Sequence, residues 1–281
     1  MMRSLGLLAL AALLGCEEGS ICREPDSGEL VARISAPVTL RKAVLRTRES
    51  TVGSLAADSI MAGFNGTGPS LGEGEDASCA HAGTAPQRCL DLAVVNAGGL
   101  REESACGERS EWREGELYQR DLQQLQPFNN NIVAIGVTGR QLYEAFEQGV
   151  SYLGQPGRFS WGGGFLHVAG AQVMMDCGGQ PRLTDDDGRV RNDQVGQRIV
   201  GICTRYHGNG PDSEPAWEMV RRDDDEARLY RVGVNEFLAG GGDSFRMWVS
   251  TTADGTTVPQ TLVEPASAGT DQGLSKITSA P

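Results

Sequence analysis

Histidine is scarce in this chain, with only three in 281 residues. They are His81, His167 and His207, and none belongs to an Asp-x-His pair or to a Gly-Asn-His-Glu segment. A two-metal hydrolase needs a cluster of Asp, His and Asn ligands around ions about 3.5–4 Å apart. We therefore expect no metal cofactor on this chain and interpret the three histidines as structural or solvated.

Other signatures of metal and nucleotide chemistry are also missing. No two cysteines have the CxxC spacing of a thiolate metal site, and no P-loop pattern occurs. The acidic segment 184–193 (TDDDGRVRND) imitates a calcium loop. It lacks the alternating oxygen ligands and the closing glutamate of an EF-hand, so we interpret it as a solvated turn.

Positively charged residues are fewer than negatively charged ones. The chain has 25 Lys and Arg against 37 Asp and Glu, a formal net charge of −12. This balance disfavours binding of nucleic acid through a basic face. A small anion such as a nucleotide would have to be met by a few local arginines.

Long hydrophobic runs are almost absent, and the one that exists begins at Leu5 and ends at Leu14, after Arg3. A run of about ten residues is too short to span a bilayer and is typical of a signal peptide. The small residue before Cys16 resembles a bacterial lipoprotein cleavage box. We expect residues 1–15 to be a signal peptide, Cys16 to be lipidated and 16–33 to be an acidic tether. Ordinary cleavage and an uncleaved anchor are the alternatives.

This N-terminus predicts an exported protein, anchored to a membrane on its periplasmic or cell-surface side. An oxidising compartment favours disulfides. The cysteines that remain after Cys16 are even in number: Cys22, Cys79, Cys89, Cys106, Cys177 and Cys203. Cys177 and Cys203 flank two expected strands and suit a cross-hairpin bridge, and Cys79 and Cys89 bracket a Gly/Ala/Pro loop. The connectivity as a whole stays open.

Hydrophobic periodicity predicts helices and strands in alternation. Helices are expected at 51–64, 121–126 and 139–149, and strands at 90–95, 131–137, 165–176, 198–206 and 230–235. This pattern indicates an α+β fold with a mixed sheet, forming one domain over 34–250. We expect 102–118 to be a surface loop and 251–281 to be a loosely packed, low-complexity tail.

Three short segments carry most of the chemical information. They are 96–101 (NAGGLR), 126–130 (QPFNN) and 235–243 (NEFLAGGGD). Glycine backbone in the first segment allows close approach of a ligand, and Arg101 offers a planar fork for a phosphate, carboxylate or sugar diol. A tight turn followed by a surface arginine is the alternative interpretation.

The other two segments each place an aromatic ring beside amide or glycine. Phe128 could stack on a nucleobase while a neighbouring amide reads its edge, and Phe237 could close a clamp from the other side. Asp243 could accept hydrogen bonds from a ribose diol. A core phenylalanine and a glycine-rich helix end with an exposed aspartate are the corresponding alternatives.

In order, spacing and flanking pattern, the three segments resemble the C-terminal, substrate-binding domain of the 5'-nucleotidases. The segment 46–53 (RTRESTVG) is similar to the family's opening segment, and 163–170 is similar to its Gly-aromatic segment. The similarity runs from about Leu40 to Trp248. The resemblance implies the same α+β fold with a mixed sheet and packed helices.

The resemblance also implies roles for individual residues. Arg46, with Arg48 as runner-up, and Arg101 would contact the sugar–phosphate side. Substrate-binding positions carried over in this way are Arg46, Asn96, Gly99, Arg101, Phe128, Asn130, Gly163, Phe237 and Asp243. Asn96 would support the arginines, Asn130 would read the base edge and Gly163 would line the pocket. One departure is Asn129, where the family usually has glycine and where added bulk narrows the pocket. A second is the helical end of the family domain, replaced here by the tail.

Family members hydrolyse phosphate esters with two metal ions in a separate N-terminal domain, and nothing in this chain resembles that domain. No catalytic residue is therefore assigned, and hydrolysis by this chain alone is not expected. The first hypothesis is an exported lipoprotein that binds a nucleoside or nucleotide between Phe128 and Phe237. The second is a subunit of a nucleotide hydrolase in nucleotide catabolism, whose divalent metals sit on a separate metallophosphoesterase chain. The third is a surface scaffold that binds no nucleotide.

Overall fold

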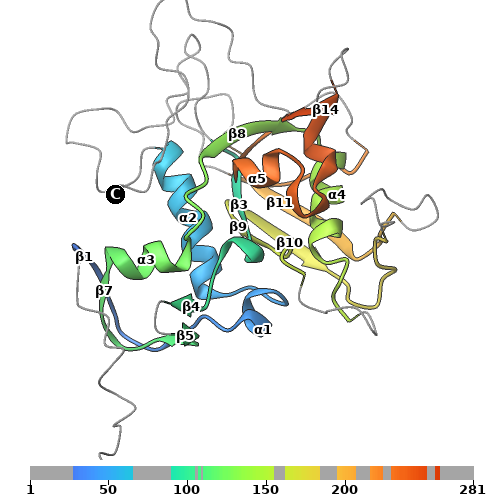
Figure 1. Cartoon of the computed structure of the whole chain (residues 1–281). Helices are drawn as coiled ribbons and strands as arrows, with labels where there is room; N and C mark the ends of the chain where they lie inside the picture. Colours follow the sequence, from blue (N-terminus) through green and yellow to red (C-terminus); the bar gives the residue numbers. More distant parts are fainter. Residues whose placement is uncertain are drawn as a thin grey trace, which may run out of the picture.

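A mixed four-stranded sheet forms the centre of the computed structural model, which describes residues 28–65, 90–104, 107–108, 110–154, 162–183, 195–206, 216–223, 229–251 and 257–259 (Figure 1). Its strands are β3 (Leu92–Asn96), β8 (Ile132–Val137), β9 (Leu166–Ala169) and β13 (Tyr230–Asn235), in the order β8-β13-β3-β9. The pair β13–β3 is parallel, whereas β13–β8 and β3–β9 are antiparallel. Every residue of β3 is buried, as expected for a short apolar run at the centre of a sheet. The fold class is α+β, as the sequence predicts.

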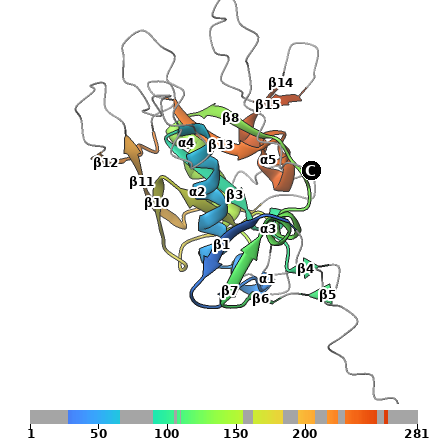
Figure 2. The same ribbon diagram turned by 90° about the vertical axis from the view of Figure 1, so that its left-hand side faces the viewer.

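Helix α2 (Thr51–Asn65) packs against β3, β9 and β13 on one side of this sheet (Figures 1 and 2). Its buried residues Val52, Ala56 and Ile60 recur at helical spacing, so one stripe faces the sheet. The expected helix at 51–64 is therefore confirmed within one residue.

A second sheet has the antiparallel order β10-β11-β12, from β10 (Ala171–Met175), β11 (Ile199–Tyr206) and β12 (Ala216–Met219). Gly170, at φ +74°, separates β9 from β10 and splits the single strand expected there. Helix α4 (Gly139–Gly149) packs against β11 and against the 3₁₀ turn η3 (Arg246–Trp248). It begins at Thr138, whose side chain forms a reciprocal capping box with Gln141.

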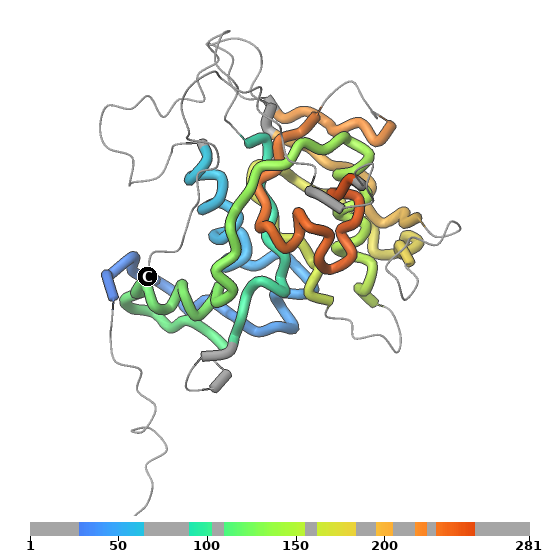
Figure 3. Tube along the Cα trace, turned by 45° about the horizontal axis from the view of Figure 1, so that its top comes forward, coloured from blue at the N-terminus to red at the C-terminus, as the bar shows by residue number. Residues whose placement is uncertain are grey.

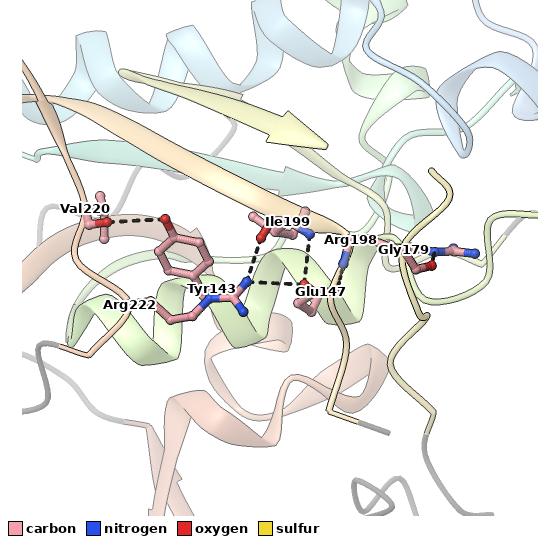
Figure 4. A network of polar contacts seen from close by, with 7 residues as sticks. All are labelled: Tyr143, Glu147, Gly179, Arg198, Ile199, Val220 and Arg222. Atoms are coloured by element: carbon pink, nitrogen blue, oxygen red, sulfur yellow. Dashed lines mark hydrogen bonds and ion pairs between the residues drawn. The ribbon is translucent and has the colours of Figure 1, made fainter. Parts of the chain in front are cut away.

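Glu147 fastens α4 to β11 through a buried carboxylate (Figure 4). Its two oxygens accept hydrogen bonds from the backbone N–H groups of Arg198 at 3.2 Å and Ile199 at 2.8 Å. Arg222 lies 3.6 Å from the same carboxylate and stacks over the ring of Tyr143. A buried charge of this kind is tolerated because it is both paired and hydrogen-bonded.

Short elements complete the fold. They are α1 (Lys42–Leu45), α3 (Gln119–Leu125), α5 (Glu236–Ala239), η1 (Ala97–Gly99), η2 (Gly242–Ser244), β1 (Leu30–Ile34), β2 (Val38–Thr39), β4 (Glu103–Ser104), β5 (Gly107–Glu108), β6 (Glu111–Trp112), β7 (Gly115–Tyr118), β14 (Val249–Thr251) and β15 (Thr257–Pro259). They pair as β1–β7, β2–β6, β4–β5 and β14–β15. The first two ribbons gather near α1 at one end of the molecule (Figure 2). Figure 3 shows the chain running from α3 into β8, with the C-terminal elements beside that strand.

The structure adds strands to two segments that were expected to lack them. The segment 102–118 is not only a surface loop, because β6 and β7 pair with N-terminal strands and bury Trp112 and Leu117. These partners are more than 70 residues away in the sequence, so local composition does not reveal them. The segment after Ser250 also contains β15, which pairs with β14.

The expected Cys177–Cys203 disulfide is absent, and both residues are free thiols. Cys203 pairs with Gln172 near the start of β10, whereas Cys177 lies two residues past the end of that strand. Five residues at about 3.4 Å each put the two Cα atoms on the order of 17 Å apart, which exceeds the roughly 7 Å limit between bridged Cα atoms. Cys16, Cys22, Cys79, Cys89 and Cys106 lie outside the described residues.

Among the described residues no helix is both long and apolar enough to cross a bilayer.

His167 is a buried structural residue of β9. Its Nε2 donates to the carbonyl oxygen of Leu45 at 2.9 Å, and its Nδ1 is buried without a hydrogen-bond partner. Burial lowers the pKa of His167 to about 4, against a smaller opposing effect of the Leu45 hydrogen bond. The imidazole is therefore neutral in the fold, and Nε2 carries the proton because a carbonyl can only accept.

This histidine makes stability depend on pH. Because the folded-state pKa of about 4 lies below the unfolded value of 6.5, the unfolded chain binds more protons between these two values. The free energy of unfolding should fall by on the order of 3 kcal/mol as pH drops from 6.5 to 4. Urea unfolding at several pH values measures this, with His167→Gln as the control that keeps a donor for Leu45 but does not titrate. If the free energy of unfolding depends on pH equally in the parent and in His167→Gln, the neutral, buried state assigned to His167 is wrong.

Gly53 gives a second test of the same contact. A β-carbon at Gly53 would lie 2.1 Å from the His167 ring, so Gly53→Ala should destabilise the fold by about 1–3 kcal/mol through overpacking. Gly63→Ala is the matched control, because Gly63 is exposed near the end of the same helix. There alanine should stabilise slightly, since it favours the helical state. If thermal unfolding shows that both variants change stability in the same direction, the close contact between Gly53 and His167 is refuted.

Candidate functional site

Two buried asparagines and an aspartate join the first and the third of the three sequence segments through hydrogen bonds. Asn96, at the end of β3, donates from Nδ2 to Oδ2 of Asp243 at 2.9 Å. Its Oδ1 accepts from Nδ2 of Asn235 at 3.0 Å. Asn235 in turn caps α5, because its Oδ1 accepts the N–H of Leu238 at 2.9 Å. We call Asn96, Asn235 and Asp243 the asparagine relay.

The direction of every bond in the asparagine relay is fixed by chemistry. The N–H of Leu238 can only donate, so the oxygen of Asn235 must face it and its NH₂ group must face Asn96. The ionised carboxylate of Asp243 can only accept, so the NH₂ group of Asn96 must face it. Both amide orientations therefore follow from their partners, and the two ends of the relay agree.

Asp243 sits on a strained turn that glycines make possible. Its φ is +49° and that of Ser244 is +67°, a left-handed conformation that is uncommon outside glycine. The carbonyl oxygen of Asp243 accepts from Nε2 of the buried Gln148 at 3.4 Å. A β-carbon on Gly163 would lie 3.2 Å from the Asp243 carboxylate. The turn is thus held by Gln148 of α4, by Asn96 of β3 and by the nearby backbone of Gly163.

Arg101 and Phe128 are in direct contact. The guanidinium carbon of Arg101 lies 4.5 Å from the centroid of the Phe128 ring, a cation–π geometry. Nη1 of Arg101 donates to the carbonyl oxygen of Gly98, and its backbone N–H donates to Leu125 at 2.9 Å. The backbone N–H of Gly98 donates to Gly163 at 2.7 Å.

Both predicted clamp residues are half-exposed. Phe128 is 49% and Phe237 is 47% exposed, which disagrees with the alternative of core phenylalanines. They extend from neighbouring strand ends, since Asn235, two residues before Phe237, pairs with Ile132 at the start of β8. A β-carbon on Gly242 would lie 2.5 Å from the Phe237 ring. This ring therefore rests on the glycine-rich turn that carries Asp243.

Asn129 has a backbone conformation that accounts for its departure from the usual glycine. Its φ is +51°, in the region where glycine is favoured and asparagine is the best tolerated substitute. Its side chain lines the cavity described next, so the expected added bulk is present there.

A cavity of about 320 Å³ opens beside Phe128. Its lining comes from α2, α3 and the ends of the central strands, and consists of Ser59, Ile60, Val95, Gly99, Gln119, Leu122, Gln123, Gln126, Phe128, Asn129, Asn130, Ile132 and Asn235. Of the predicted site residues, only Gly99, Phe128 and Asn130 line it. We call it the amide chamber, because six of its side chains are carboxamides.

The remaining predicted residues lie elsewhere. Asn96, Arg101, Gly163, Phe237 and Asp243 share contacts around the asparagine relay and its turn but do not line the amide chamber. Arg46 follows α1 as its partly buried C-cap residue, and neither it nor the exposed Arg48 lines the chamber.

Sequence reasoning missed Asn235 and the polar residues of α2 and α3. Asn235 lies directly before the helical residues 236–239, and asparagine in that position is a known N-cap signal. No comparable signal marks Ser59, Gln119 or Gln123, because surface helices commonly carry such residues.

Among the residues that the structure describes, no three His, Cys, Asp or Glu side chains gather closely enough to hold a metal ion. The described part of the chain therefore offers no donor set that fits the two ions of a metallophosphoesterase.

The asparagine relay can be tested by replacing the amide of Asn235 with a carboxylate. Asn235→Asp would keep the acceptor for Leu238 but place a carboxylate oxygen against Oδ1 of Asn96. We expect a loss of about 1–3 kcal/mol in the free energy of unfolding, because buried acceptors then face each other. Urea unfolding measures this, with Asn130→Asp as the control outside the relay. Equal stabilities for the two variants would contradict the relay.

Comparison with known proteins agrees with this architecture. The family model described as "5'-nucleotidase, C-terminal domain" matches residues 30–250. A 5'-nucleotidase of Bos taurus is 26% identical over 205 residues, covering 72% of this chain and 27% of its own length. A probable 5'-nucleotidase of Treponema pallidum is 26% identical over 160 residues, covering 56% of this chain and 21% of its own length.

The crystal structure of a 5'-nucleotidase precursor from Thermus thermophilus superimposes with a TM-score of 0.51 at 24% identity. The match covers 82% of this chain and 34% of that one, so the likeness shows a shared fold. The chain thus spans between 21% and 34% of the length of these relatives. With its matched region running from the first described strand, β1, into β14, the chain belongs to the 5'-nucleotidase C-terminal domain family.

Proposed function

We propose that this chain binds a nucleoside or nucleotide, with the base held between Phe128 and Phe237. The observation that carries the proposal is the pair of half-exposed rings at neighbouring strand ends, beside a carboxylate fixed by the asparagine relay. Exposed aromatic rings on a rigid frame lose little conformational freedom when a base stacks on them. Membership of the 5'-nucleotidase C-terminal domain family supports the same ligand class.

In this proposal Asp243 holds the ribose. Its Oδ2 accepts from Asn96, while an ionised carboxylate has lone pairs on both oxygens for further hydrogen bonds. The left-handed turn and the bond from Gln148 fix the backbone of Asp243. A preorganised acceptor recognises a diol at a smaller entropic cost than a mobile side chain.

Arg101 and Arg46 are proposed for the phosphate side. One guanidinium nitrogen of Arg101 donates to Gly98, which leaves donors for an anion, since arginine carries five N–H groups. The net charge of −12 makes the overall field unfavourable for a phosphate. This unfavourable field should weaken the binding of a nucleotide more than the binding of a nucleoside. Local arginines have to compensate for that difference in affinity.

We also propose a cellular location for the protein. The N-terminal residues favour an exported lipoprotein with Cys16 lipidated, which would place the domain at a membrane on the periplasmic or cell-surface side.

The second candidate function is a subunit of a nucleotide hydrolase. The 5'-nucleotidases that it matches are about four to five times longer than their matched regions, and the described residues offer no metal-binding cluster. A separate metallophosphoesterase chain would then supply divalent metals and the hydrolytic step, and this chain would position the nucleotide.

Calorimetric titration of the purified protein with adenosine, AMP and UDP-glucose tests the first proposal. We expect saturable binding that Phe237→Ala weakens by about 10–100-fold, because one stacked ring contributes roughly 1–3 kcal/mol. Trp217→Ala is the control, as Trp217 is an exposed aromatic residue on β12. No saturable heat with any of the three ligands would overturn the proposal in favour of a surface scaffold.

Reconstitution separates the two candidate functions. Co-purification of a metallophosphoesterase chain, with AMP hydrolysis only in the mixture, would establish the subunit function. Binding of nucleosides without any such partner would favour the binding protein.

A further inference from the structure

The amide chamber adjoins the proposed nucleotide site beside Phe128. Two residues assigned to the base, Phe128 by the proposed function and Asn130 by the family resemblance, line it. The residues proposed for the ribose and phosphate, Asp243, Arg46 and Arg101, do not. Phe237 is also not part of the lining, so the chamber is not the gap between the two rings. Its lining places it on the side of Asn130, toward α2 and α3.

The lining of the amide chamber is polar but uncharged. None of the described residues that line it is an Asp, Glu, Lys, Arg or His, although these types make up much of the chain. Carboxamides offer both donors and acceptors, and Ile60, Val95 and Leu122 add apolar walls. Such a surface satisfies a neutral hydrogen-bonding group, whereas a charged group would lose hydration without gaining a counter-ion.

The size of the chamber suits a substituent with a ring or several heavy atoms. Its volume of about 320 Å³ is at the lower end of the range for small-ligand pockets, roughly 300–1,000 Å³. Helix α2 contributes Ser59 on one side and α3 contributes Gln123 on another. Both residues are exposed, so the chamber is open enough for a ligand to enter without unfolding.

We infer that the amide chamber is a specificity site for nucleosides whose base carries an uncharged, hydrogen-bonding substituent on its edge. The inference rests on the proposed function, because Phe128 and Asn130 must hold the base for its edge to face the chamber. It goes further in naming the class of ligand: a base enlarged by a neutral polar group is preferred over the unmodified base and over one that carries an anionic group.

Two isosteric ligands test this preference. N6-(carbamoylmethyl)adenosine and N6-(carboxymethyl)adenosine differ only in an amide against a carboxylate at the end of the substituent. Calorimetry with the full chain should show the amide binding about tenfold tighter than adenosine, as one or two net hydrogen bonds allow. The carboxylate should bind no tighter than adenosine.

Filling the chamber gives the matching test on the protein. Ser59→Trp should abolish the tenfold gain for the amide ligand and leave the affinity for adenosine within about twofold of the parent, since Ser59 belongs to α2 and not to a segment that carries either ring. Gln123→Trp, introduced from the other helix, should act in the same way and covers the case in which one variant misfolds. Asp58→Trp is the control, because Asp58 is the exposed neighbour of Ser59 and does not line the chamber.

The outcomes separate the specificity site from the proposed function. If adenosine binds and Phe237→Ala weakens it, but the amide ligand binds no tighter than adenosine, the clamp stands and the specificity site is overturned. Retention of the tenfold gain by both tryptophan variants would overturn the specificity site as well. If adenosine itself does not bind, the proposed function fails and the specificity site fails with it.

Discussion

The hydrogen bond from Asn96 to Asp243 is the contact through which the distant parts of the site become one structure. These two residues are 147 positions apart in the sequence, and Asn235 connects the same amide to α5, which carries Phe237. Because both donor directions are fixed by obligatory partners, the asparagine relay has a single satisfied arrangement. A buried polar network of this kind specifies geometry more than it adds stability.

Helix α4 links this arrangement to the rest of the fold through two consecutive residues. Glu147 holds the helix to the start of β11 by accepting two backbone N–H groups. Gln148, the next residue, reaches the carbonyl oxygen of Asp243. Any displacement of α4 on the second sheet therefore changes the support of the Asp243 turn. The glycines around that turn serve the same purpose, since side chains at Gly163 or Gly242 would push the carboxylate or the Phe237 ring away.

The sequence predicted the elements whose pattern is local and missed contacts that depend on the tertiary fold. The α2 stripe, α4 and β13 could be predicted because hydrophobic periodicity is a property of neighbouring residues. The pairing of Trp112 with Val38 could not be predicted, because no sequence feature near either residue identifies its partner. The Cys177–Cys203 error has the same origin: both cysteines flank expected strands, but the register that separates them is set by pairing. The site segments could be identified from their order and glycine content, whereas the role of Asn235 and the amide chamber required the packing of α2, α3 and the sheet.

Neutral amides make most of the side-chain hydrogen bonds that hold the carboxylate of the site. Asn96, Asn235 and Gln148 position its carboxylate, and carboxamides line the chamber beside its base end. Amides do not titrate and their hydrogen bonds are little affected by ionic strength, so the bond between Asn96 and Asn235 does not depend on pH or salt while the fold persists. Charge is supplied by Asp243 and the arginines, which are the residues proposed to contact the ligand. Salt should therefore change the affinity for a phosphate far more than the affinity for a base and ribose, because screening acts on exposed ion pairs and not on stacking.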